Sequence, residues 1–119
     1  METESKTFRV TAAGRVYMRF LAAFNMGDLE ALREFVEENY ADSVIEQHSL
    51  DVLVGWHFDT YEATQGMSIH KVFLTQEHYI IVIVKSKADG TMFMDKMKIT
   101  ADLPHKIVEY FHEASPIGM

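Results

Sequence analysis

The chain has 119 residues, a formal net charge of −7 and no cysteine. This length fits one domain over residues 1–119, and the lack of cysteine excludes disulfides, thiolate nucleophiles and cysteine-based metal sites. Nucleic-acid binding is not expected, because it needs clustered Lys and Arg, and the 11 basic residues here are scattered. No segment approaches the roughly 20 apolar residues of a membrane span, and the N-terminus lacks a hydrophobic signal core. We therefore expect a cytoplasmic protein without membrane contacts.

The first half of the chain predicts three helices. Apolar residues recur at helical spacing from about residue 7 to residue 25. Gly27 and Asp28 then end one helix and begin the next, expected over 29–40 with its acidic residues facing solvent. Ser43-Val44-Ile45-Glu46 fits a capping box and predicts a third helix to about residue 65, unless Gly55 interrupts it. This helix is apolar on two sides, so we expect it between the sheet and another helix or another subunit.

Beyond Gly66 the apolar period changes to two. Strands are expected over 67–76, 78–88, 91–101 and 105–113. Short links, including the hairpin signal Asp89-Gly90, predict an antiparallel meander. The fold class is therefore α+β, with three N-terminal helices packed on a curved four-stranded antiparallel sheet. Because the run YIIVIV (79–84) has no polar face, both sides of this strand should be covered, and we expect a homodimer through the sheet.

The third strand carries an acid among apolar residues. In TMFMDKMKI (91–99), Phe93, Asp95, Met97 and Ile99 share one face. A buried carboxylate is costly unless it is paired. Asp95 is then either a working acid in a pocket or a structural anchor, paired with Lys71, Arg19 or a backbone donor. Alternation alone leaves open which faces of the first and last strands point inward.

A pocket is expected where polar and aromatic side chains face the sheet. The candidate lining residues are Tyr17, Phe20, Trp56, Tyr61, Phe93, Asp95 and Met97. Asp95 and His57 are the candidate catalytic residues. The six histidines show no metal-ligand spacing, and there is no glycine-rich phosphate loop. We expect no metal and no cofactor.

Two stretches resemble the nuclear transport factor 2-like superfamily. RFLAAFNMGDLEALREFV (19–36) joins two helices through an Asn-x-Gly-Asp turn, and FMDKMKI followed by HKIVEYFH is similar to the final hairpin of that superfamily. The resemblance implies a cone-shaped, cystatin-like sheet wrapped around a pocket that helices close. Members include ketosteroid isomerase, polyketide cyclases, scytalone dehydratase and non-catalytic binding domains, so the fold leaves the function open.

The comparison with the isomerase concerns three positions. Asp95 corresponds to an aspartic acid that an apolar site keeps neutral, so that it donates a hydrogen bond to the developing oxyanion. The tyrosine that accompanies this acid corresponds to Phe20, which has no hydroxyl, and Tyr17 lies one turn earlier. The nearest matches to the general base are Asp42 and Glu46.

Three hypotheses follow for the function. The first is a non-catalytic, dimeric domain whose apolar pocket binds a small hydrophobic molecule or has a structural role. The second is an acid–base isomerase, cyclase or dehydratase with Asp95 as neutral proton or hydrogen-bond donor and His57 or Glu46 as base. The third is an interaction module for a partner protein. An enzyme requires Asp95 and a second titratable group at one open cavity, whereas a binding domain requires polar groups that are already paired with each other.

Overall fold

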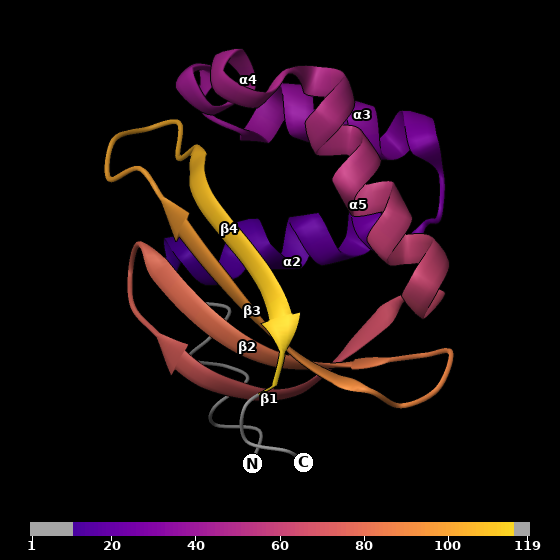
Figure 1. Cartoon of the computed structure of the whole chain (residues 1–119). Helices are drawn as coiled ribbons and strands as arrows, with labels where there is room; N and C mark the ends of the chain where they lie inside the picture. Colours follow the sequence, from indigo (N-terminus) through magenta and orange to yellow (C-terminus); the bar gives the residue numbers. More distant parts are fainter. Residues whose placement is uncertain (1–10, 116–119) are drawn as a thin grey trace.

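The computed structural model of the chain describes residues 11–115. The helices are α2 (Ala12–Asn25), α3 (Leu29–Asn39), α4 (Asp42–His48) and α5 (Leu50–Thr64), and the strands are β1 (Met67–Thr75), β2 (Tyr79–Ser86), β3 (Met92–Ile99) and β4 (Ile107–Ala114). The strands form one antiparallel sheet in the order β1-β2-β3-β4. Helix α2 crosses one face of the curved sheet, α4 lies near the start of β4, and α5 runs from α4 back towards the start of β1 (Figure 1). The predicted α+β class and antiparallel meander are confirmed.

The first two helices begin with side-chain caps. The Thr11 hydroxyl accepts a hydrogen bond from the Gly14 N–H at 3.0 Å at the start of α2. The Asp28 carboxylate does the same for Ala31 N–H at 3.2 Å at the start of α3, directly after Gly27 with its φ of 65°. The helix break predicted at Gly27-Asp28 is confirmed. Residues 7–10 of the predicted first helix lie outside the described residues.

The third predicted helix is two helices. The break is at Ser49, whose φ of 79° is left-handed, and whose hydroxyl accepts from the Val52 N–H at 3.2 Å to begin α5. Helix α4 begins at Asp42 after Ala41, which makes no side-chain cap. The predicted capping box at Ser43 is therefore wrong, and Gly55 lies inside α5 without interrupting it.

The core lies between α2 and the inner face of the sheet. Tyr17, Phe20 and Phe24 of α2 are buried against residues of β2 and β3. Helix α5 buries Leu53 and Val54, but Val52 and Trp56 on its other side are 42% and 54% exposed. The single chain covers one apolar side of this helix, so cover of the other side by another subunit stays a prediction.

Irregularities in the strands decide which residues face inward. The register of β1 shifts between Ile69 and Lys71 and again between Val72 and Leu74, so Met67, Ile69 and Val72 lie opposite inward residues of β2. In β4 a shift opposite Lys98 and Ile99 leaves Val108 out of the pairing. Each bulge changes the parity of its strand, and neither alternative offered by simple alternation describes β1 or β4.

The outer face of the sheet is partly buried without a second subunit. Ile83 of β2 is 0% exposed and Met94 of β3 is 6% exposed in the single chain. The outer-side burial that YIIVIV was expected to need is therefore already present at Ile83. Phe73 and Leu74 of β1 remain exposed.

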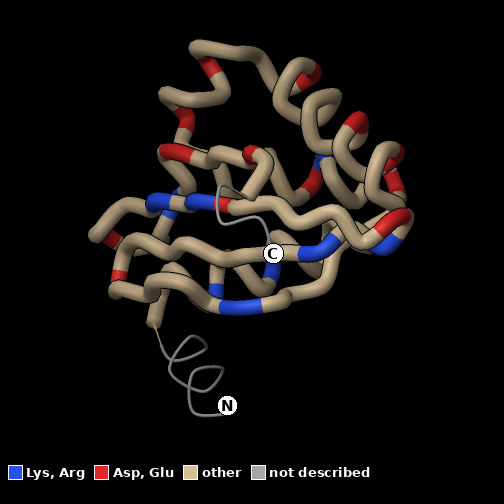
Figure 2. The backbone as a smooth tube through the Cα atoms, turned by 60° about the horizontal axis from the view of Figure 1, so that its bottom comes forward, with Lys and Arg blue, Asp and Glu red and all other residues tan. Residues whose placement is uncertain are grey.

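Charged residues divide between the two layers. Figure 2 shows the acidic residues mostly over the helices and the basic residues mostly along the strands. All acids of the run 28–46 are exposed, which confirms the prediction that this run is a solvated helix face. Within residues 11–115, no helix has the length and apolar character needed to cross a membrane.

Candidate functional site

A fully buried carboxylate organises the inner face of the sheet. Asp95 is 0% exposed, and its Oδ2 accepts hydrogen bonds from the Tyr17 hydroxyl at 2.7 Å and the Tyr110 hydroxyl at 2.9 Å. Its Oδ1 lies 2.6 Å from His112 Nδ1. We call Asp95, Tyr17, Tyr110 and His112 the Asp95 cluster. Its members come from β3, α2 and β4, so the cluster connects helix α2 to the last two strands of the sheet.

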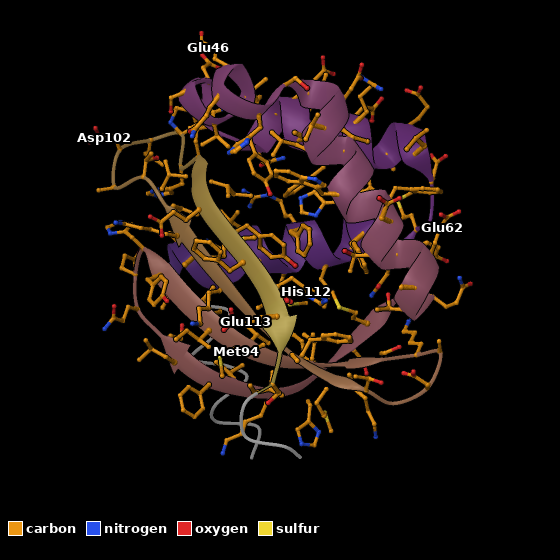
Figure 3. The ribbon with its side chains drawn as sticks, viewed as in Figure 1. Glu46, Glu62, Met94, Asp102, His112 and Glu113 are labelled. Atoms are coloured by element: carbon orange, nitrogen blue, oxygen red, sulfur yellow. The ribbon has the colours of Figure 1, made fainter. Side chains whose placement is uncertain are left out.

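The register of the last hairpin builds this cluster. Asp95 lies directly opposite His112, and Met97 lies opposite Tyr110, so His112 and Tyr110 share the inward face of β4. Figure 3 shows His112 and its neighbour Glu113 on opposite sides of this strand. Tyr17 reaches the carboxylate from the buried stripe of α2.

The tyrosines of the cluster act as donors. Burial raises the pKa of Tyr17 and of Tyr110 well above the usual value, and the negative charge of Asp95 raises both further. Their hydroxyls therefore keep their protons and donate to Asp95. The partners expected for an anchoring Asp95 were Lys71, Arg19 or a backbone donor. That expectation is corrected, because two phenols and an imidazole surround the carboxylate.

A second polar pair lies nearby. The Tyr40 hydroxyl and His57 Nε2 are 2.8 Å apart. Burial, with a contribution from the charge of His112, lowers the pKa of His57 to about 4, so His57 is neutral near pH 7. Burial, with a contribution from the charge of Asp95, raises the pKa of Tyr40. The Phe20 ring separates this pair from the cluster, with centroids 5.1 Å from His57 and 5.0 Å from Tyr110.

A pocket opens between α4, α5 and the free edge of β4. Its volume is about 400 Å³, within the range of small-molecule sites. One wall is the last strand, and the facing wall is the helices. The lining residues are Tyr40, Val44, His48, Leu53, Trp56, His57, Thr60, Val108, Glu109, Tyr110, Phe111 and His112. Because Tyr110 and His112 are both lining residues and partners of Asp95, the cluster lies directly behind the pocket wall.

The predicted site residues fall in three places. Trp56 and His57 line the pocket. Asp95, Tyr17, Phe20 and Met97 are 0% exposed and do not belong to its lining. Tyr61 packs its ring 5.8 Å from that of Phe24, and Phe93 stacks on His112 at 4.4 Å.

Sequence reasoning missed three residues of the site. Tyr40, Tyr110 and His112 supply the hydrogen-bonding groups that join the pocket wall to His57 and Asp95. Tyr110 and His112 alternate along β4, so the sequence predicted that they share a face. The sequence did not decide whether this face or the opposite one points inward. Tyr40 gave no signal beyond its place on the apolar stripe of the predicted second helix.

Among residues 11–115, no group of three His, Asp or Glu side chains is placed to hold a metal ion. No protein-family model, curated protein or solved structure matches this chain. The class of protein therefore rests on its own geometry. It is an α+β domain with helices on one face of a four-stranded antiparallel sheet and a pocket at the edge of the last strand.

Proposed function

We propose that this protein binds a small, mostly apolar molecule in the pocket between α4, α5 and β4, without catalysis. The observation that carries the proposal is a pocket of about 400 Å³ with aromatic and aliphatic walls. Sites for small molecules combine such walls with a few fixed polar groups. Trp56, Phe111 and Tyr110 supply apolar area here, and the polar side chains of the lining include His57 and His112.

Pairing of the polar groups supports binding over acid–base catalysis by Asp95. Tyr40 and His57 engage each other, and both oxygens of Asp95 are engaged by side chains of the protein. Asp95 also has no exposed surface from which to reach a ligand. A neutral donor role for Asp95, with His57 as base, is the alternative proposal. It would require Asp95 to exchange a tyrosine or histidine contact for a ligand contact.

The resemblance to the nuclear transport factor 2-like superfamily is part of the proposal. The order of helices before an antiparallel sheet and the placement of Asp95 facing α2 support it. The tyrosine hydroxyl next to Asp95 comes from Tyr17, whereas Phe20, at the position that the resemblance aligns with the isomerase tyrosine, separates the cluster from His57.

The assembly of the protein is a separate proposal. The exposed side chains of Phe73 and Leu74 in β1, of which Leu74 lies opposite the outward Ile81, support a homodimer through the sheet. The alternative is that a second copy or a partner protein binds at the pocket rim, where Trp56 and Phe111 are exposed. Sedimentation equilibrium of the wild type and of Leu74→Asp tests the sheet dimer, which predicts a monomeric variant. Cytoplasmic residence stays a prediction.

Ligand binding is testable with a neutral fluorescent probe. Trp56 is the one tryptophan of the chain and lines the pocket, so N-phenyl-1-naphthylamine bound there should accept energy from it. Val44→Phe fills the pocket and should weaken probe binding at least about tenfold, since a group of this size competes for the same volume. Val52→Phe is the matched control, because Val52 is exposed on α5 and lies outside the lining. Equal binding by both variants contradicts the proposal.

A further inference from the structure

One nitrogen of the Asp95 cluster is unused. His112 Nδ1 is held by Asp95 Oδ1 at 2.6 Å, and its ring is fixed by stacking on Phe93 with a centroid separation of 4.4 Å. The residues that the structure describes offer no hydrogen-bond partner to His112 Nε2. The side chain is 16% exposed and lines the pocket. The cluster therefore presents one imidazole nitrogen to whatever the pocket holds.

The partners of Asp95 fix which nitrogen of His112 carries the proton. Tyr17 and Tyr110 both donate to Oδ2, which stabilises the ionised carboxylate. An ionised carboxylate only accepts hydrogen bonds, so His112 Nδ1 is the donor in the 2.6 Å contact. In the neutral ring the proton is then on Nδ1, and Nε2 keeps its lone pair. A carboxylate that orients an imidazole in this way also stabilises the imidazolium that forms when Nε2 takes a proton.

The imidazole of His57, which also lines the pocket, does not compete for this proton. His57 is 5% exposed, and its Nε2 is engaged by the Tyr40 hydroxyl. It has no carboxylate partner among the contacts within residues 11–115, and burial opposes its protonation by lowering its pKa. Three histidines thus line the pocket and differ in their partners. His57 is neutral and bound to Tyr40, His48 packs against Trp56, and among residues 11–115 only His112 is held by a carboxylate.

We infer that His112 is the proton-accepting residue of the pocket, and that the ligand is a small, mostly apolar weak acid, such as a phenol or an enol, whose O–H meets Nε2. This inference rests on the proposed function. In the step, the ligand O–H bond breaks and an Nε2–H bond forms. The ligand oxygen keeps the electron pair, and the new imidazolium keeps its Nδ1–H on Asp95. The ligand enters neutral, so the net charge of −7 does not oppose its approach.

A pair of probes tests the inference. 4-Nitrophenol can lose a proton and its phenolate absorbs visible light, whereas 4-nitroanisole has nearly the same size and no acidic proton. Both should quench Trp56 on binding. Ionisation of bound 4-nitrophenol should have its midpoint at least about one pH unit lower in the wild type than in His112→Gln, because an imidazolium stabilises a neighbouring anion. The glutamine side chain of this variant is polar and of similar size but cannot take a proton. Binding of 4-nitroanisole should be equal in the two proteins.

Apart from the substituted residue, the titratable groups around the probe are the same in the wild type and in each variant. The titratable groups at or behind the pocket wall, besides His112, are Asp95, Tyr110, His57, His48, Tyr40 and Glu109. Only the change at His112 should therefore move the midpoint. His70→Gln, at an exposed position of β1, is the matched histidine control and should behave as the wild type.

The outcomes separate the two proposals. If 4-nitroanisole binds and the midpoint of bound 4-nitrophenol is the same in wild type and His112→Gln, the inference is overturned while ligand binding stands. If neither probe binds to the wild type, both fail. A measurement without any variant gives a further check. Nitrogen NMR of the free protein, at a pH where the His112 ring is neutral, should show the Nδ1–H tautomer, and a neutral ring protonated on Nε2 would overturn the inference.

Discussion

Two buried polar groups meet at one pocket wall, and they differ in charge and in access. The Asp95 cluster holds a carboxylate with three side-chain partners and no exposed surface. The Tyr40–His57 pair is neutral and belongs to the pocket lining. A buried charge demands several partners, because each unmatched lone pair is costly in an apolar interior. The neutral pair has no charge to compensate, so it can lie in the pocket lining with fewer partners.

The comparison predicts that the cluster dominates stability. Asp95→Asn keeps the shape but places an amide between three donors, and we expect the free energy of unfolding to fall by about 3–5 kcal/mol. Urea unfolding measures the change. Asp59→Asn, at an exposed position of α5, is the control and should change stability by less than about 0.5 kcal/mol. A similarly small change in the free energy of unfolding for Asp95→Asn would contradict the anchoring role of Asp95.

The neutral pair predicts the response to acid. The pKa of His57 is about 4 in the folded chain and about 6.5 when unfolded. Between these values the unfolded state binds more protons, so stability is present above pH 6.5 and is lost as the pH falls towards 4. The expected loss is about 3 kcal/mol. His57→Gln should lack this component, and the difference between the two unfolding curves across pH isolates it. Parallel curves would contradict a neutral His57.

Single hydroxyl deletions sharpen the contrast further. Tyr17→Phe removes a hydrogen bond to a charged acceptor, which is worth about 2 kcal/mol, while Tyr40→Phe removes a bond between neutral groups, worth about 1 kcal/mol. Both side chains are buried and both variants keep the ring. Equal losses in chemical denaturation would show that the two groups do not differ in charge.

The smallest effect on stability should come from the pocket rim. Trp56 is 54% exposed and lines the pocket. Trp56→Ala should change the free energy of unfolding by less than about 0.5 kcal/mol, yet weaken binding of N-phenyl-1-naphthylamine, followed by the fluorescence of the probe. A variant that unfolds easily and binds normally would place Trp56 in the core and not in the site.

The local elements of this protein were predictable from short segments. The helix break at Gly27-Asp28, the four strands and the antiparallel order follow from capping chemistry, apolar period and short links. The break at Ser49 did not, because a left-handed serine carries no signal as clear as that of a glycine. The apolar residues around Asp95 predicted its burial. The alternation of side chains along a strand predicted that Asp95 shares a face with Phe93 and Met97.

The sequence by itself determined the fold class and singled out Asp95 as an acid on an apolar strand face. Only the tertiary structure decided its partners, because Tyr17, Tyr110 and His112 are brought together by the packing of α2 and by a register shift in β4. One bulged residue exchanges the two faces of a strand, and no local pattern in the sequence places that bulge. The pocket depends on it as well, since the same shift turns Tyr110 and His112 towards the helices.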